Sequence, residues 1–408
     1  MDKSQKITII EIAILFIAGL FPILWFRQGS ILAYGDDFPL YLNAHKVFAA
    51  GPYLWSTDYL GYATPAPAYL LYQYSGAFLS TLGLSISQIQ IAMKVFLFLV
   101  AGLSMFYLTK KIYPQYRFAA FIAGFFYLFN FFVLLDVNNI GFIWTYAFLP
   151  LLLALFFTAI AATYQQDKKA ANKHIIYFAI VSVVAFSFAS INPANVALLI
   201  IGLAVLTIYF LVKYRNQLRP LLLSLGKIVG ATLSLNLWWL IPVFGSFVFS
   251  PSQTLTSKIS IEAWSWTQNR ASFLNLFWLN GYWNWLPEYY PYWKYYSSPN
   301  YSSMPVLTIL VFVPFIVAGA ALLFRSNKSR FNAYLMMVIL CFLFLATGLH
   351  YQDSFGLPNK FLFSLPFMTI FREPVSKFTL LLMPFLALLV GYASDNICLL
   401  YTSDAADE

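Results

Sequence analysis

The chain has 408 residues, of which 61% are hydrophobic, 20% aromatic and only 10% charged. Apolar runs of seventeen or more residues recur along it, and about 20 apolar residues are enough for a helix to cross a bilayer. This composition excludes a soluble globular protein. Because the runs are continuous and do not alternate, they favour helices over a closed barrel, and we expect an all-α, polytopic membrane protein.

We expect about ten transmembrane helices in one bundle. The first follows Lys3 and Lys6 and lacks a small-residue cleavage site, which indicates an uncleaved first span. No polar stretch is long enough for a soluble domain, so residues 1–397 are predicted to form one membrane-embedded domain. The predicted spans are 7–26, 91–109, 118–135, 142–164, 175–192, 194–212, 221–245, 304–324, 331–349 and 378–394.

The last eleven residues, CLLYTSDAADE at 398–408, resemble a translated sequencing adapter. We therefore expect this tail to be foreign to the natural protein, and the membrane domain to be truncated at its C-terminus near Ile397. The two cysteines, Cys341 and Cys398, are too few for a disulfide framework or a cysteine-based metal site.

The basic residues fall in alternate loops. With the N-terminus in the cytoplasm, every short loop on the cytoplasmic side is basic, as the positive-inside rule requires. The net charge of +9 therefore indicates orientation in the plasma membrane, and we expect no nucleic-acid partner. The residues concerned are Lys110, Lys111, Arg117, Lys168, Lys169, Lys173, Lys213, Arg215, Arg219, Arg325, Lys328 and Arg330.

Three long connections fall on the opposite, extracytoplasmic side: residues 27–90, 246–303 and 350–377. Within the first, residues 67–83 are apolar but interrupted by Tyr, Gln, Ser and Gly, which favours a helix lying in the membrane interface. Large loops on one side of a helical bundle are where a functional site is expected.

The first of these loops carries two adjacent carboxylates, Asp36 and Asp37, in the stretch AYGDDFPLYL. One interpretation is a solvated Asx-type turn that begins at Gly35. The other is a carboxylate held at the membrane surface as a general base or a metal ligand. The spacing alone leaves both open.

The second loop holds six of the eleven tryptophans of the chain, with several tyrosines beside them. They can form an aromatic belt at the level of the lipid headgroups. They can also form a platform that stacks on sugar rings, because such side chains are large, rigid and amphipathic. These tryptophans are Trp264, Trp266, Trp278, Trp283, Trp285 and Trp293.

The third loop ends in Arg372, Glu373 and Lys377, immediately before the last predicted span. Pro374 suits the first turn of that helix. Glu373 and Lys377 are four residues apart and can pair on one helix face. Alternatively, Arg372 and Lys377 can present two cations to a phosphate, one as a planar fork and one as a point charge.

Familiar catalytic motifs are absent from the sequence. It contains no HExxH, GxGxxG, Walker A or GxSxG motif, and His45, His174 and His350 are far apart. We therefore expect neither a zinc site nor a nucleotide cofactor.

Taken in order, these features resemble the membrane-embedded GT-C glycosyltransferases, and in particular the N-terminal membrane domain of alpha-(1->3)-arabinofuranosyltransferases. The likeness covers nearly all of residues 7–394. Its first feature is an acidic residue, Asp36 or Asp37, soon after the first span. FREPVSKF is its most specific motif. The motifs are LWS (54–56), GYATPAP (61–67), FYLFN (126–130), FLPLLLAL (148–155), NPAN (192–195), WWLIP (238–242) and FREPVSKF (371–378).

The resemblance implies a polyprenyl-phosphate-linked sugar as donor, with a pentofuranose among the candidates, and an extracytoplasmic glycan or glycolipid as acceptor. Asp36 or Asp37 would be the catalytic base, since a positioned carboxylate contributes about 10²–10⁴-fold. The neighbouring aspartate could instead orient the acceptor or ligate a divalent metal. Arg372 and Lys377 would stabilise the charge on the leaving phosphate.

The acceptor or its sugar would be bound by Trp55, Asp58 and Glu373. Two other functions stay open: a transporter or flippase for a lipid-linked sugar, and an inactive accessory subunit of a glycan-assembly pathway. A transporter should carry ionisable residues in mid-membrane. Glu11, Lys94 and Lys227 are instead predicted near span ends or within the first turns, which favours an interfacial site.

Overall fold

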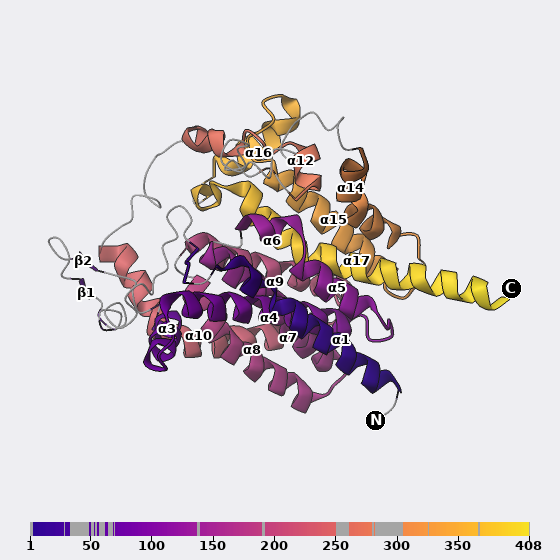
Figure 1. Cartoon of the computed structure of the whole chain (residues 1–408), viewed down its shortest axis with the longest axis horizontal. Coiled ribbons are helices and arrows are strands. Elements are labelled where there is room, and N and C mark those ends of the chain that lie inside the picture. The colour runs from indigo at the N-terminus through magenta and orange to yellow at the C-terminus, as the bar shows by residue number, and fades with distance from the viewer. Residues whose placement is uncertain are drawn as a thin grey trace. The chain divides into compact units, whose positions relative to one another are not determined.

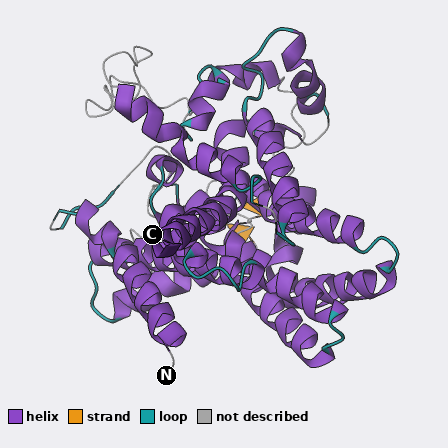
Figure 2. Ribbon diagram, turned by 90° about the vertical axis from the view of Figure 1, so that its right-hand side faces the viewer, coloured by secondary structure: helices purple, strands orange, loops and turns teal. Residues whose placement is uncertain are grey.

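The structure is a computed structural model of the chain, and helices make up most of what it describes (Figures 1 and 2). The chain divides into two compact units, residues 1–114 with 137–253 and residues 115–136 with 254–408. The described residues are 3–27, 29–32, 49, 53, 55–56, 62–63, 68, 70–136, 139–189, 192–249, 261–279, 281, 305–324, 326–365 and 368–407.

In the first unit the helix α7 is central, because it packs against α4, α8 and α9. The one β-ladder of the described residues pairs Trp55 with Ala63, a small exception to the all-α prediction. The elements are α1 (Lys3–Gly19), η1 (Phe21–Trp25), β1 (Trp55–Ser56), β2 (Tyr62–Ala63), α3 (Leu70–Thr81), α4 (Ile86–Ile112), α7 (Ile140–Tyr164), α8 (Lys168–Ala189), α9 (Pro193–Lys213) and α10 (Leu218–Phe249).

In the second unit the helix α17 is central, because it packs against α5, α14 and α15. The elements are α5 (Ala119–Leu128), α6 (Phe131–Asp136), η3 (Ile261–Gln268), α12 (Phe273–Phe277), α14 (Pro305–Ala320), α15 (Ser329–Ala346), η6 (Ser354–Gly356), α16 (Leu357–Phe363), η7 (Met368–Phe371) and α17 (Pro374–Asp407).

Eight helices of the described chain are long and apolar enough to cross a membrane, which confirms a multi-span helical membrane protein. Two of the ten predicted spans, 118–135 and 304–324, are not among them. The helix α3 falls within the predicted interfacial segment, whose position in the membrane stays a prediction. The eight are Gln5–Trp25, Ile86–Ile112, Ile140–Tyr164, Lys168–Ala189, Ala194–Lys213, Leu218–Gly245, Ser329–Ala346 and Pro374–Leu399.

The predicted span 118–135 is wrong as one continuous helix, because the chain breaks between α5 and α6. Asn130 stands at the break and caps both helices. Its Nδ2 donates to the carbonyl oxygens of Phe126 and Tyr127 at 3.1 and 3.0 Å, and its Oδ1 accepts from the backbone N–H of Val133 at 3.0 Å. Asn130 therefore satisfies backbone groups that each helix end leaves without an intrahelical partner.

The helix α4 begins five residues before the predicted span that starts at 91. Ser85 and Gln88 form a capping box, in which the Ser85 hydroxyl accepts from the N–H of Gln88 and the Gln88 side chain accepts from the N–H of Ser85. As a result Lys94 lies more than two turns inside the helix, where it is buried. The prediction that Lys94 lies in the first turn is therefore wrong.

The ends of four helices meet at one end of the first unit. Tyr164, the last residue of α7, donates from its hydroxyl to the carbonyl oxygen of Gln217 at 2.8 Å and stacks on Tyr214 at 3.5 Å. The hydroxyls of Thr163 and Ser224 lie 2.9 Å apart. The C-termini of α7 and α9 therefore lie beside the N-termini of α8 and α10.

The C-terminus of α4 lies at the same end, since Lys111 is close enough to His174 in the first turns of α8 to interact with it electrostatically. Lys227 of α10 donates to Asn172 of α8 at 3.4 Å. We call this the basic end of the first unit. Its cations are Lys110, Lys111, Lys168, Lys169, Lys173, Lys213, Arg215, Arg219 and Lys227.

This arrangement constrains the path of the chain between α4 and α7. Both helices end at the basic end, so α7 must begin at the opposite end, about 37 Å away for 25 residues at 1.5 Å each. The chain from Tyr113 to Asn139 therefore leads from one end of the first unit to the other.

The second unit also has a basic end. The hydroxyl of Tyr392 donates to Ser326 at 2.9 Å, and the buried carboxylate of Asp395 accepts from the N–H of Phe118 at 2.7 Å. The C-terminal part of α17 therefore lies beside the starts of α5 and α15. The exposed or half-buried cations there are Arg117, Lys328 and Arg330.

Candidate functional site

The opposite end of the second unit is rich in aromatic residues, and we call it the aromatic end. It is formed by η3 and α12, by the chain from the end of α15 through η6 and α16, and by η7 with the first turns of α17. The ring of Phe273 lies 5.7 Å from that of Tyr351 and 5.6 Å from that of Phe355. These contacts join α12 to the chain that follows α15.

Arg372 is fixed at this end by two contacts with η3. Its guanidinium lies over the ring of Trp264, with 4.3 Å between Cζ and the ring centroid. Its carbonyl oxygen accepts from the hydroxyl of Thr267 at 3.1 Å. A cation over an aromatic face gains about 0.5–2 kcal/mol, and this stacking uses the face of the guanidinium, not the N–H edges with which arginine binds phosphate.

Gln268, the last residue of η3, ties this helix to the chain after α15. Its side chain is buried, and its Oε1 accepts from the N–H of Leu349. Its carbonyl oxygen lies 3.1 Å from Nδ1 of His350. Because a carbonyl oxygen can only accept, Nδ1 of His350 carries the hydrogen. Leu349 and His350 therefore hold the end of η3, the helix that contacts Arg372, in place.

Gly348 makes this close approach possible. Its φ of +53° lies in the left-handed region, which residues with a Cβ rarely adopt. A Cβ at this position would overlap Oε1 of Gln268 and lie 2.6 Å from Cγ of Pro374. Glycine is therefore required where the turn after α15, the end of η3 and the start of α17 meet.

Lys377 lies one turn into α17 and is 2% exposed, so its ammonium group is buried within the protein. Glu373 is half-buried, immediately before the helix. Two further polar side chains of this segment, Ser376 and Thr379, are buried, and within the described residues their hydroxyls have no hydrogen-bond partner. The start of α17 thus carries more buried polarity than a purely structural helix requires.

The predicted catalytic residues Asp36 and Asp37, and the predicted acceptor residue Asp58, lie outside the described residues. The chain leading toward them is anchored at Leu32. Gln90 of α4 accepts from the N–H of Leu32 at 2.7 Å and donates to its carbonyl oxygen at 2.6 Å. The start of the first loop is therefore held against α4, and the roles of the three aspartates stay predictions.

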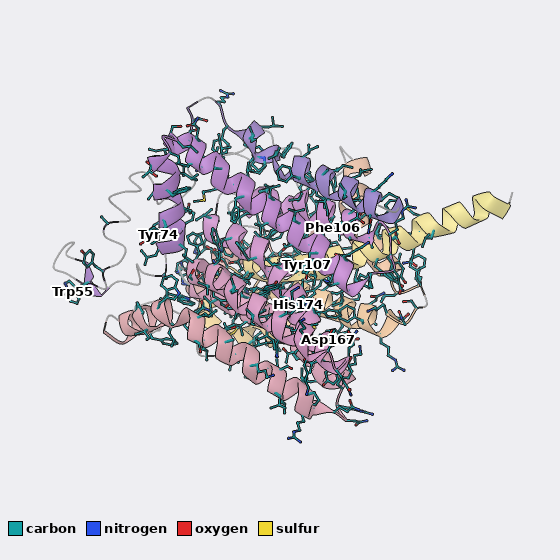
Figure 3. The ribbon with its side chains drawn as sticks, turned by 90° about the horizontal axis from the view of Figure 1, so that it is seen from below. Trp55, Tyr74, Phe106, Tyr107, Asp167 and His174 are labelled. Carbon is teal, nitrogen blue, oxygen red and sulfur yellow. The ribbon has the colours of Figure 1, made fainter. Side chains whose placement is uncertain are left out.

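Trp55, the predicted sugar-binding tryptophan, lies in β1 of the first unit and is 59% exposed. Tyr53 is 66% exposed, and Tyr74 of α3 is 50% exposed. Figure 3 labels Trp55 and Tyr74. Exposed aromatic rings of this kind can stack on sugars, so the exposure is compatible with the predicted role of Trp55.

The described acids of the aromatic end do not form a metal centre. Asp353 caps η6, since its Oδ1 accepts from the N–H groups of Phe355 and Gly356 at 3.0 and 3.3 Å. Across the part of the chain that the structure describes, no three His, Cys, Asp or Glu side chains lie close enough together to hold a metal ion.

The sequence pointed to Arg372 as a candidate but not to the residues that contact its segment. Thr267, Gln268 and Gly348 are separated from Arg372 by up to 105 residues, and no motif marks them. Trp264 was one of six tryptophans in its loop, and the pattern gave no reason to single it out. These four positions are linked to Arg372 only by the fold.

No protein family, no curated protein and no solved structure matches this chain. The likeness to GT-C glycosyltransferases therefore rests on the sequence motifs.

Proposed function

We propose that the protein is a membrane glycosyltransferase of the GT-C type. It transfers a sugar, with a pentofuranose among the candidates, from a polyprenyl-phosphate donor to an extracytoplasmic glycan or glycolipid. The basic ends of the two units would face the cytoplasm, following the positive-inside rule, and the aromatic end would face outward.

The observation that carries this proposal is the geometry of Arg372. Half of the 24 lysines and arginines lie in the basic loops, whereas Arg372 stacks on Trp264 and its carbonyl oxygen is hydrogen-bonded to Thr267. Lys377 lies one turn away and is buried. Two positioned cations at one end of an apolar helical unit suit a phosphate whose prenyl chain lies in the bilayer.

In the proposed reaction, an acceptor hydroxyl oxygen attacks the anomeric carbon of the donor sugar. The bond between that carbon and the phosphate oxygen breaks, and the polyprenyl phosphate leaves with the electron pair. Asp36 or Asp37 takes the hydroxyl proton. Arg372 and Lys377 stabilise the negative charge that develops on the phosphate. Trp55, Asp58 and Glu373 contact the acceptor or its sugar.

A transfer assay tests this function. Purified full-length protein is given a panel of polyprenyl-phosphate sugars, and the wild type is compared with Asp36→Asn, Asp37→Asn and the double variant. We expect transfer from at least one donor and its loss in one single variant. Unchanged transfer in all three variants would remove the catalytic role of this loop.

Transport of a lipid-linked sugar is the second candidate, and one observation favours it. Glu11 of α1 and Lys94 of α4 are each 5% exposed inside predicted spans, and the two helices pack against each other. Ionisable residues buried in a membrane often mark a translocation path. If wild-type protein transfers no sugar but moves the lipid across vesicles, and Glu11→Gln abolishes that movement, transport is the function. Inactivity in both assays would indicate an accessory subunit.

A further inference from the structure

The basic end of the first unit combines a large excess of cations with few acids. Nine lysines and arginines lie there. Among the described residues, the acid at this end is Asp167, whose carboxylate accepts from the N–H of Ala170 at 2.9 Å and so caps α8. A strongly positive end of this kind is expected to attract anions. The positions of its side chains indicate where an anion would bind.

Two of these cations, one at the end of α4 and one in the first turns of α8, lie near the same histidine. Lys111 and Lys173 are both exposed, and both interact electrostatically with the half-buried ring of His174. They come from different helices. Two flexible ammonium groups at one place form a better anion site than isolated surface lysines.

Each of the two lysines lies over a tyrosine one turn away on its own helix, Tyr107 before Lys111 and Tyr177 after Lys173. Nζ of Lys111 is 5.1 Å from the ring centroid of Tyr107, and Nζ of Lys173 is 5.6 Å from that of Tyr177. Tyr177 also meets His174 edge to face at 6.2 Å. Figure 3 labels Tyr107 and His174 on their two helices. Cations followed by aromatic rings are the pattern of a membrane interface.

Beyond Tyr177 the exposed side of α8 is apolar. Ile176 is 57% exposed and Ile180 is 54% exposed. Their side chains, with the half-exposed ring of Tyr177, form a strip on α8 that starts one turn after Lys173. An acyl chain can lie along such a strip, whereas a soluble anion would leave it unused.

We infer that Lys111 and Lys173 bind the phosphate of an anionic phospholipid, with the acyl chain of that lipid lying along Tyr177 and Ile180. This site is separate from the donor site of the proposed function, because it lies at the basic end of the first unit and uses none of the same residues. A bound lipid would bridge α4 and α8. Clusters of Lys and Arg near the membrane surface recognise anionic lipids in this way.

Native mass spectrometry of the full chain in detergent tests this inference. Phosphatidylglycerol and phosphatidylcholine are titrated separately into wild-type protein, into Lys111→Gln/Lys173→Gln, and into Lys168→Gln/Lys169→Gln. The last variant is the matched control, since it removes two exposed lysines from the start of the same helix.

We expect the wild type to bind phosphatidylglycerol more tightly than phosphatidylcholine. Each lysine removed from the site should weaken phosphatidylglycerol binding about fivefold, so the first variant loses about 25-fold, while the control loses about twofold or less. Equal losses in the two variants would show diffuse attraction to the whole basic end, and would overturn the site. So would the absence of a headgroup preference in the wild type.

A second measurement on the wild type does not depend on the variants folding. Binding of phosphatidylglycerol should weaken steeply between 0.1 and 1 M salt, since the Debye length falls from about 10 to 3 Å. Inorganic phosphate at millimolar concentration should compete poorly, because it cannot use the apolar strip. Salt-independent binding, or complete displacement by inorganic phosphate, would overturn the proposed lipid.

Discussion

The cations of the basic ends and those of the aromatic end differ in how they are held. At the basic end of the first unit, Lys111 and Lys173 are exposed, and each lies over a tyrosine of its own helix. At the aromatic end of the second unit, Arg372 is stacked on Trp264 and Lys377 is buried. Exposed cations orient a protein in a membrane and attract lipid. Stacked or buried cations are held in one position.

The two ends should therefore differ in how well they tolerate substitutions. Removing one exposed lysine of the basic end should change sugar transfer little, because none of these lysines is proposed to contact the donor. Removing Arg372 should change a great deal, since η3 and the turn after α15 are built around its segment. The predictions below test that contrast, beginning with the largest expected effect.

Replacing Arg372 by Ala should have the largest effect. Because the guanidinium is proposed to stabilise the leaving phosphate, we expect sugar transfer to fall by about 10²–10³-fold, with the fold intact. Arg372→Lys should recover little of this, since lysine lacks the planar fork. Initial rates with the polyprenyl-phosphate donor provide the measurement.

The matched control is Arg330→Ala, which removes an exposed arginine from the basic end of the same unit. Its transfer rate should stay within about twofold of the wild type. If Arg330→Ala and Arg372→Ala reduce transfer equally, the contrast between the two ends is wrong.

Gly348→Ala should have the largest effect on stability. The new Cβ would overlap Gln268 and approach Pro374, and the φ of +53° is strained for alanine, so we expect a loss of about 1–3 kcal/mol in the free energy of unfolding. Gly319→Ala in α14 is the control, because a Cβ there meets nothing within 4 Å. Thermal unfolding in detergent should separate the two, and similar midpoints would contradict the close packing at Gly348.

Trp264→Leu should affect transfer moderately. It removes the ring beneath the Arg372 guanidinium, which is worth about 0.5–2 kcal/mol, so we expect a loss of about 3–30-fold. Trp264→Phe should retain part of the activity, because phenylalanine still offers an aromatic face. If Trp264→Phe transfers sugar as slowly as Trp264→Leu, the stacking does not position Arg372.

Thr267→Val should have the smallest effect. It removes the hydroxyl that donates to the carbonyl oxygen of Arg372 while keeping the shape of the side chain. The net value of one such hydrogen bond is about 1 kcal/mol, so the unfolding midpoint should fall slightly and transfer by less than tenfold. A loss as large as that of Arg372→Ala would give Thr267 a role that the structure does not suggest.

Most of the membrane spans could be predicted from the sequence, because the length of an apolar run is enough to identify a crossing helix. The break at Asn130 could not. One asparagine in FYLFNFFVLL hardly changes the hydropathy of the run, but its side chain competes for backbone groups on both sides. The early start of α4 depended on the capping box at Ser85, a short signal outside the apolar window.

The candidate site could be predicted only in part. Arg372 and Lys377 could be predicted because they lie on the side opposite the basic loops, within the motif FREPVSKF. Their partners come from distant segments: Trp264 lies 108 residues before Arg372, and the contact between Gln268 and Leu349 spans 81 residues. No periodic pattern in the sequence reports such long-range pairings.

Direct binding of a polyprenyl monophosphate, without any sugar, tests the central claim most directly. With excess phosphatidylglycerol present to fill the proposed lipid site at the basic end, the affinity of the full chain is measured for the wild type, for Arg372→Lys and for Lys111→Gln/Lys173→Gln. We predict that Arg372→Lys weakens binding at least tenfold and that the double variant at the basic end leaves it unchanged. If instead the basic-end variant loses the ligand and Arg372→Lys keeps it, the phosphate binds by diffuse charge, and the aromatic end is not the donor site.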